Sequence, residues 1–200
     1  MPRTPEQNKN IKDKRRSKLM LFALKAFAEK GYDKTAIDDI TKPAKCSHGL
    51  FYHYFDSKET VFRALIKEYL TQPGSIPLAE ALSLGGTKGL RLLCDYTEEI
   101  AKGDGKGMAC ATIILRLEDA KNLDDDAKRF AKENNLRAAL VQLIKQGQAE
   151  GKVVAGDPKE IVQAVLDLAS GALKRLQKKD AAIISGDVLF GFLLKGPIEE

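Results

Sequence analysis

The residues with the greatest potential for chemistry lie in the stretch KCSHGLFYHYFDSK, which covers positions 45–58. It holds both histidines of the 200-residue chain, His48 and His53, beside two tyrosines and two phenylalanines. In a chain with 6% aromatic residues and no tryptophan, such a run has three explanations: a packed core, a metal site, or a helix that contacts nucleic acid.

The spacing within this stretch favours a surface over a core or a metal site. His48 and His53 are five residues apart, so they do not share one helical face, and no third metal ligand lies near them. Helical periodicity turns Leu50, Phe51 and Phe55 toward a core. It leaves an outward row of polar and small residues, namely His48, Gly49, Tyr52 and Tyr54.

Those outward residues suit contact with DNA. Tyrosine hydroxyls and histidine N–H groups can donate to phosphates, which fixes the register of a helix on the duplex. Gly49 leaves space for a close approach to a base edge or sugar. We therefore predict that this stretch forms a helix that lies in the major groove.

The neighbouring elements have the dimensions of a helix-turn-helix. Apolar residues at helical spacing predict a first helix over residues 10–30, ended by Gly31. Short helices are expected over 37–44 and 47–54, with Ser47 as the cap of the second. Ser57 then begins a fourth helix that continues to about residue 70.

Residues 19–70 resemble the DNA-binding domain of the TetR family of bacterial transcriptional regulators. Several independent positions agree at fixed spacing, whereas the rest of the chain agrees with the family only in size and helix content. The matching residues are Phe27-Ala28-Glu29-Lys30-Gly31-Tyr32, Thr35, Ile37, Ile40, Ser47, Gly49, Phe51, Tyr52, Tyr54, Phe55 and Ser57-Lys58-Glu59.

The resemblance implies which residues touch DNA. His48, Gly49, Tyr52 and Tyr54 fall on positions that contact bases or backbone in the family, and Lys58 falls on one that binds a phosphate. The place of Lys58 in the first turn of a helix supports this, because free N–H groups and the helix dipole attract anions there. The expected DNA contacts are Thr35, Lys45, Ser47, His48, Gly49, Tyr52, His53, Tyr54 and Lys58.

The turn between the two short helices departs from the family pattern. The family usually has Ala-Ala-Gly where this chain has Pro43-Ala44-Lys45. Proline lacks an N–H group and disfavours helix at the residue before it, so we expect the first short helix to end early or bend. Lys45 must adopt the left-handed conformation that glycine takes easily, at a cost of about 1 kcal/mol.

Positive charge is concentrated in the first third of the chain. Residues 1–70 contain 15 Lys and Arg against 9 Asp and Glu, a balance of +6, whereas the remainder contains 18 against 19. We expect a basic N-terminal arm to add salt-sensitive attraction to DNA and in part to reach the minor groove. Its cations are Lys9, Lys12, Lys14, Arg15 and Arg16.

The remaining sequence predicts an all-α protein with two domains. Helical patterns continue throughout, and no stretch alternates with a period of two. The break at Gln72-Pro73-Gly74-Ser75 separates a helix-turn-helix DNA-binding domain, 1–72, from a helical effector-binding and dimerisation domain, 73–200. Helices are expected near residues 76–83, 87–102, 107–120, 124–150, 158–178 and 186–194.

Two of these later helices carry apolar stripes. One comprises Leu136, Leu140, Leu143, Ile144 and Gly147, and the other runs from residue 161 to 176. Such stripes form either an internal core or a four-helix seam between two subunits. The resemblance favours a homodimer through the helices near 124–150 and 158–178, which would present two recognition helices about 34–36 Å apart to a palindrome.

By the same resemblance, a small-molecule effector lies among the middle helices and shifts the helix that links the domains, here residues 60–70. Few aromatic residues follow position 71, so we expect a medium-sized apolar or amphipathic ligand. The candidate lining residues, chosen for position and polarity, are Tyr96, Ile100, Met108, Cys110, Thr112 and Arg116.

The expected function is a ligand-responsive transcriptional repressor that binds operator DNA and needs no cofactor or metal. The alternative is a helical small-molecule or protein-interaction module that has lost DNA binding, motivated by Pro43 and Lys45. An enzyme has no support, because no nucleophile–base pair or metal ligand set is visible. The polar N-terminus and the lack of a long apolar run predict a cytoplasmic protein without a membrane span. A thiol sensor at Cys94 or Cys110 stays open.

Overall fold

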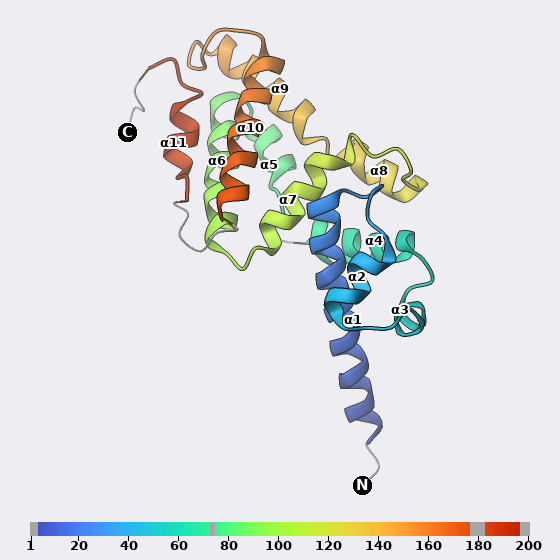
Figure 1. The fold of residues 1–200 in the computed structure, drawn as a ribbon. Coiled ribbons are helices and arrows are strands. Elements are labelled where there is room, and N and C mark those ends of the chain that lie inside the picture. Colours follow the sequence, from blue (N-terminus) through green and yellow to red (C-terminus); the bar gives the residue numbers. More distant parts are fainter. Residues whose placement is uncertain (1–3, 73–74, 177–182, 197–200) are drawn as a thin grey trace. The chain divides into compact units, whose positions relative to one another are not determined.

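The computed structural model describes residues 4–72, 75–176 and 183–196, without the side chains of residues 8 and 169–176. The regular elements in these ranges are helices (Figure 1). Among the described residues there is also one isolated antiparallel bridge, between Val153 and Leu194. The all-α prediction is thus confirmed. The described residues fall into two compact units: residues through Gln72 with Thr112–Glu133, and residues 75–111 with those from Asn134 onward.

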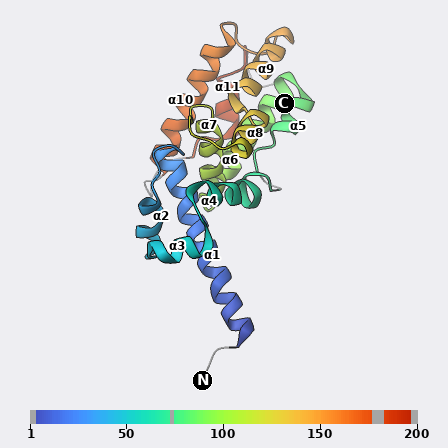
Figure 2. The same ribbon diagram turned by 90° about the vertical axis from the view of Figure 1, so that its right-hand side faces the viewer.

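The first helix of the first unit, α1 (Pro5–Lys30), begins earlier than predicted. The Thr4 hydroxyl accepts from the backbone N–H of Gln7 at 3.2 Å, and the Gln7 side chain accepts from the N–H of Thr4 at 3.1 Å. This capping box, with Pro5 as the first helical residue, fixes the start. The expected basic arm is therefore helical, and its first turns extend past α2 and α3 (Figures 1 and 2).

Aromatic rings join α1 to α4 (Lys58–Leu65). The ring centroid of Phe62 lies 5.0 Å from that of Phe27 and 4.8 Å from that of Tyr32, and both contacts are edge-on. All three side chains are buried. Edge-on aromatic pairs add stabilisation beyond the area that they bury, so this cluster holds α4 at a fixed position on α1.

Along the chain, α1 and α4 are separated by α2 (Ile37–Ala44) and α3 (His48–Tyr54). The predicted ranges of both short helices are confirmed. Pro43 occupies the last turn of α2 and does not end it early, so that one of the two expected outcomes, an early end or a bend, is wrong. The backbone N–H of Lys45 bonds to the carbonyl of Lys42, and that of Cys46 to the carbonyl of Thr41, which closes the turn. Lys45 has φ 52° and ψ 50°, the left-handed conformation that was predicted.

The fourth helix does not run uniformly to residue 70. After Leu65 the chain forms a π-helical turn, η1 (Ile66–Leu70). Two of its main-chain carbonyl groups have hydrogen-bond partners close by in the chain. The Thr71 hydroxyl donates to the carbonyl of Ile66, and the Gln72 amide donates to the carbonyl of Lys67. A π turn adds one residue to an α-helical ladder, and such turns often occur at functional sites.

The second unit is centred on α6 (Gly86–Lys102), which packs against α5 (Leu78–Leu84), α9 (Leu136–Ala149) and α11 (Gly186–Gly191). A further helix, α10 (Pro158–Leu176), packs on α9. The approach of α5 and α6 requires Gly89, since a Cβ atom there would lie 2.2 Å from the carbonyl oxygen of Ala81. The division between the units falls within α7 (Lys106–Leu117).

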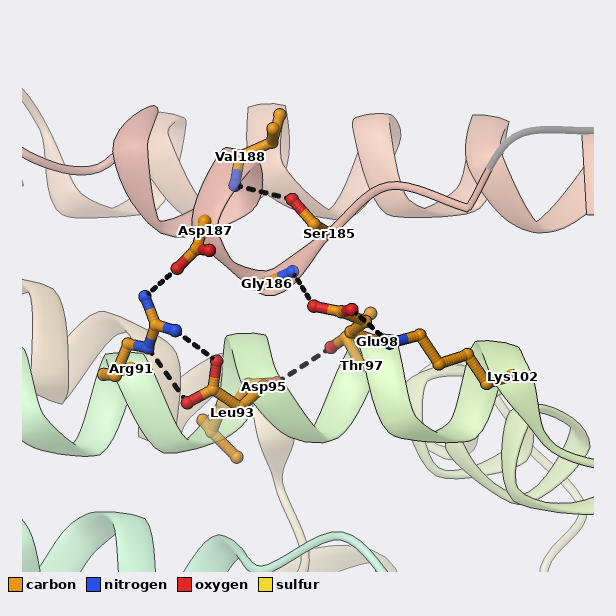
Figure 3. Close-up of polar contacts among 10 residues, drawn as sticks. All are labelled: Arg91, Leu93, Asp95, Thr97, Glu98, Lys102, Ser185, Gly186, Asp187 and Val188. Atoms are coloured by element: carbon orange, nitrogen blue, oxygen red, sulfur yellow. Dashed lines mark hydrogen bonds and ion pairs between the residues drawn. The ribbon is translucent and has the colours of Figure 1, made fainter.

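Polar contacts fasten α11 to α6 (Figure 3). The guanidinium of Arg91 bridges Asp95, at 2.9 Å, and Asp187, at 2.5 Å. The backbone N–H of Gly186 donates to Glu98 at 2.7 Å. A Cβ atom on Gly186 would lie 3.1 Å from the backbone of α6, so a larger residue there would push α11 and α6 slightly apart.

The predicted helix 124–150 is wrong, because the structure has two helices there. The first is α8 (Asp125–Glu133), in the first unit, and the second is α9, in the second unit. The side chain of Asn135 accepts from the N–H of Ala138 at 2.7 Å and so begins a new helix.

The apolar stripe on α9 is an internal core. All five of its predicted members are buried within the single chain, Leu143 and Ile144 almost completely. The prediction that this stripe forms a seam between two subunits is therefore wrong. On α10, Val162 and Leu166 are buried, whereas the side chains of 169–176, and residues 177 and 178 altogether, lie outside the described residues.

Candidate DNA-binding site

The helix α3 is fixed at both ends and along its inner face. The Ser47 hydroxyl accepts from the N–H of Leu50 at 3.2 Å, as predicted for its cap. Phe51 and Phe55 are buried, with 0% and 2% of their surface exposed. Leu50 is only half-buried, although a core position was expected. Two buried rings and one cap thus set the orientation of the short helix.

The outer face of α3 and its turn gathers most of the predicted DNA contacts. The exposed residues of this face are Lys45, Ser47, His48, Gly49, Tyr52 and His53. Tyr54 is half-buried. A Cβ atom on Gly49 would have no atom within 4 Å, so packing within the protein does not require glycine there. This face presents hydroxyl, imidazole and ammonium groups to solvent, and no side chain projects from it at Gly49.

Thr35 does not belong to that face. Its side chain is 3% exposed, and its hydroxyl donates to the carbonyl of Gly31 at 2.7 Å. The hydroxyl therefore stabilises the turn between α1 and α2 and is not available to a phosphate.

Ala36, the N-cap residue of α2, has no side chain that could accept a hydrogen bond. The carboxylate of Asp39 accepts from the Ala36 N–H at 3.0 Å and so ties the start of the helix to its first turn.

Lys58 lies in the first turn of α4, as predicted, but its ammonium is held within the protein. The Nζ atom donates to the carbonyl of Tyr32 at 3.0 Å and lies 4.5 Å from the centroid of the Tyr32 ring. Burial, followed by the nearby carboxylate of Glu59, raises the pKa of Tyr32, so the ring stays neutral beneath the cation. One of the three N–H groups of the ammonium is used by this carbonyl, which leaves two for a phosphate.

Among the arm residues, Arg16 is committed elsewhere. Its guanidinium donates to Glu68 in η1, at 2.9 Å for Nη1, and lies 5.4 Å from the centroid of the Phe55 ring. Arg16 therefore ties α1 to the π-helical turn and is removed from the expected DNA contacts of the arm. Lys9, Lys12, Lys14 and Arg15 are exposed on α1.

The contacts of two carboxylates beside the site, those of Asp38 and Asp33, were not predicted from the sequence. Asp38, in the first turn of α2, contacts Lys42 through one carboxylate oxygen and His48 through the other. The spacing of Asp38 and Lys42 by four residues on a helix is a signal for the first pair. The second pair links two helices, and nothing in the spacing along the chain indicates it.

A second carboxylate, that of Asp33, lies just before α2. It accepts from the backbone N–H groups of Lys121 and Asn122, at 2.8 and 3.0 Å, and from the Asn122 amide at 3.1 Å. These bonds, that of Lys121 first, lower the pKa of Asp33. They fasten the segment between α7 and α8 to the turn that leads into the helix-turn-helix.

The comparisons with known proteins agree with this geometry. Residues 20–65 match the family described as bacterial regulatory proteins, tetR family. The transcriptional regulator AcuR of Cereibacter sphaeroides is 31% identical over 162 residues, which are 78% of this chain and 74% of that protein. The chain belongs to the TetR family. It is a transcriptional regulator of that family.

Other members are similar over different lengths. The HTH-type transcriptional repressor Rv1474c of Mycobacterium tuberculosis is 27% identical over 167 residues, 81% of this chain and 82% of that protein. The HTH-type transcriptional regulator YuxN of Bacillus subtilis is 44% identical over 57 residues, 28% of this chain and only 20% of that protein.

A solved structure shows the same fold for this TetR-family chain. The crystal structure of AibR in complex with isovaleryl coenzyme A and operator DNA has a TM-score of 0.57, at 16% identity. The likeness covers 88% of this chain and 94% of that one. Where the structure describes this chain, none of its helices could cross a bilayer, and no cluster of three or more potential metal ligands occurs.

The predicted effector residues of this regulator are divided between the two units. Tyr96 and Ile100 on α6, and Met108 and Cys110 on α7, belong to the second unit. Arg116 belongs to the first unit, where its guanidinium donates to the carbonyl of Glu29 at 2.7 Å. Arg116 therefore holds the end of α1, and its role toward an effector stays a prediction. Thr112 also falls in the first unit.

Burial shifts the pKa values of the two titratable residues among the effector candidates in the second unit. It raises the pKa of Tyr96 to about 12 and that of Cys110 to about 11, and these two groups interact. Burial also raises the pKa of Cys94 to about 12. Thiols with such pKa values stay protonated near neutral pH, which makes them poor nucleophiles and disfavours a thiol sensor.

Proposed function

We propose that this TetR-family regulator is a cytoplasmic repressor that binds a palindromic operator as a homodimer and is released by a small-molecule effector. The observation that carries the proposal is the outer face of α3, with Lys45, Ser47, His48, Gly49, Tyr52 and His53 exposed together on a capped and anchored helix. Tyr54 and Lys58 would join them at the edge of the contact. The chain's relative Rv1474c is named a repressor, which supports the sign of regulation.

Homodimerisation follows from what α3 must do. One short helix reads only part of an operator, whereas two related by symmetry read both halves of a palindrome. Three apolar side chains of α10, those of Ile161, Val165 and Leu168, are only half-buried in the single chain. A second copy would bury them further, so α10 is the element from which we expect the dimer seam.

The effector site is proposed around Tyr96, Ile100, Met108 and Cys110. These side chains are partly or fully buried, and they combine an apolar surface with one hydroxyl and one thiol. Such a lining suits an apolar or amphipathic ligand with a single polar group. The AibR complex pairs isovaleryl coenzyme A with operator DNA, which is an example of a regulator of the same fold with both kinds of ligand.

The experiment is a fluorescence anisotropy titration of labelled duplexes drawn from the DNA upstream of the coding sequence and from a random pool after selection by the protein. Sequence-selective, salt-sensitive binding is expected. Tyr52→Ala should weaken it about 10–100-fold, whereas Phe192→Ala, which removes a ring that is 62% exposed in the second unit, should leave it unchanged. Equal binding of Tyr52→Ala and the unsubstituted protein would contradict the proposal.

The alternative of a module without DNA binding loses its motivation. It depended on Pro43 and Lys45, yet α2 keeps its full length and Lys45 takes the left-handed conformation that the turn needs. The geometry of the turn gives no reason for lost DNA binding.

A further inference from the structure

Asp38 on α2 faces the recognition helix across the turn. Its Oδ2 atom lies 2.9 Å from Nζ of Lys42, and its Oδ1 atom accepts from Nε2 of His48. Each carboxylate oxygen therefore holds a different nitrogen donor: one on His48 of the proposed DNA-binding face, and one on Lys42, an exposed residue of α2. The hydrogen bond from Lys42, followed by that from His48, lowers the pKa of Asp38, so the carboxylate is charged at neutral pH.

The neighbouring acid, Asp39, has a different role. It accepts from the ammonium of Lys30 on α1 at 2.5 Å and from the backbone N–H of Ala36 at 3.0 Å. Asp39 thus caps α2 and joins it to α1. Asp38 also lies in the first turn of α2, but both of its side-chain partners lie toward α3 or the outer surface.

All three members of the Asp38 cluster are accessible to a duplex. The exposed fractions of the side chains are 45% for Asp38, 77% for Lys42 and 54% for His48. An ion pair this exposed contributes little to folding. Its position beside Ser47 and the N-terminus of α3 makes its effect on DNA binding the more important one.

The carboxylate competes with DNA phosphates for the same donors. Phosphate contacts supply nearly all of the sequence-independent binding to DNA, and each cation that neutralises a phosphate adds to the salt dependence. While Asp38 holds these two residues, the ammonium of Lys42 does not bring its full charge to a phosphate, and Nε2 of His48 is occupied. Contacts to base edges from other residues of α3 are unaffected by this competition.

We propose that Asp38 is a specificity-determining residue of the regulator. By occupying Lys42 and His48, it weakens binding to arbitrary DNA and leaves discrimination to the side chains that reach the bases. The proposal depends on the proposed function, binding of duplex DNA through α3, and adds to it a residue that limits the affinity.

The test is Asp38→Asn, which keeps the size and an acceptor oxygen but removes the charge. Two probes are used: a duplex selected from a random pool by the unsubstituted protein, and the same duplex with its sequence scrambled. We expect Asp38→Asn to bind the scrambled duplex about tenfold more tightly, with a slope of log K against log salt that is steeper by about 0.9. The ratio of affinities for the two duplexes should fall.

Two further variants make the result specific. Asp119→Asn makes the same change in charge at an exposed residue between α7 and α8, and it should leave the slope unchanged. Adding Lys42→Ala to Asp38→Asn should restore the original slope. A misfolded variant cannot imitate the expected result, because misfolding lowers the affinity for both duplexes.

Three outcomes overturn the inference. If the slope of Asp38→Asn equals that of Asp119→Asn, or if both duplexes gain affinity equally, Asp38 does not determine specificity while the proposed function stands. If the unsubstituted protein selects no duplex from the pool, the proposed function fails, and the inference fails with it.

Discussion

The two units of the molecule keep their shape by different means. In the first unit, short helices begin at capping residues that lie next to them in the chain, such as Ser47 and Ser57, and are anchored by aromatic rings. In the second unit, α5 and α11 approach α6 closely at Gly89 and Gly186, and Glu98 of α6 accepts from the backbone N–H of Gly186. Local contacts are visible in a sequence, whereas long-range ones are not, and the two units therefore differ in how well they can be predicted.

The largest expected effect tests the aromatic anchor of the first unit. Phe51→Ala should lower the free energy of unfolding by about 3–5 kcal/mol, because the ring is fully buried beneath α3 and its loss leaves a cavity. Urea denaturation followed by circular dichroism measures the change. A loss below about 1 kcal/mol, far less than such a cavity costs, would show that α3 does not depend on this anchor.

The corresponding test of the second unit is Gly89→Ala. The added methyl group would lie 2.2 Å from the carbonyl oxygen of Ala81 and 2.7 Å from a methyl of Leu143. Because α5 must move to accept it, we expect a loss of about 1–3 kcal/mol in the same assay. An unchanged or higher stability would contradict the close packing of α5 on α6.

Lys45→Gly should have a smaller effect of the opposite sign. Glycine adopts the left-handed conformation without the steric cost that Lys45 bears, so the free energy of unfolding should rise by about 1 kcal/mol. The same variant removes an exposed cation, and the salt dependence of DNA binding should weaken. Lys34→Gly, at another exposed lysine of this unit, is the control for lost charge.

Gly49→Ala separates stability from binding. Alanine is favoured over glycine in a helix by about 1 kcal/mol or less, and nothing in the protein lies within 4 Å of the added atom. We expect stability to rise by about 0.5 kcal/mol and DNA affinity to fall, since the methyl group meets the duplex. Unchanged affinity in the anisotropy titration would place Gly49 outside the contact.

The smallest effect concerns pH. Hydrogen bonds from Lys121 and Asn122 lower the pKa of Asp33 in the folded chain, so the stabilisation is present above the ordinary pKa of about 4. It is lost as the pH falls through the lowered value, because the folded carboxylate then takes up a proton. Asp33→Asn should therefore reduce stability by a few tenths of a kcal/mol at about pH 7 and by less near pH 3. If the stability difference between Asp33→Asn and the unsubstituted protein grew as the pH fell, folding would not lower the pKa of Asp33.

The sequence predicted much of the first unit because its determinants are local. The ranges of α2 and α3, the Ser47 cap and the left-handed Lys45 all follow from residue types at neighbouring positions. The start of α1 could also have been predicted, since Thr4, Pro5 and Gln7 form a recognisable capping sequence. The burial of Thr35 could not, because its hydroxyl bonds to main-chain carbonyls of Ala26 and Gly31 that sequence spacing does not reveal.

The second unit was predicted less well for the same physical reason. The break before α9 had a local signal, the cap residue Asn135, but the length of the apolar pattern favoured one helix. Whether the α9 stripe faces α6 or another subunit depends on tertiary packing, which periodicity cannot distinguish. The same limit applies to one contact of the first unit, since Arg116 and Glu29 lie 87 residues apart in the chain.

Both histidines of the chain lie on α3, and both are exposed. An NMR spectrum of the imidazole ring protons would therefore contain signals from the recognition helix and from nowhere else in the sequence. One signal would report on the end of the helix beside Asp38, and the other on the opposite end. The protein thus carries a natural spectroscopic label for the proposed DNA-binding face, with no need for a fluorophore.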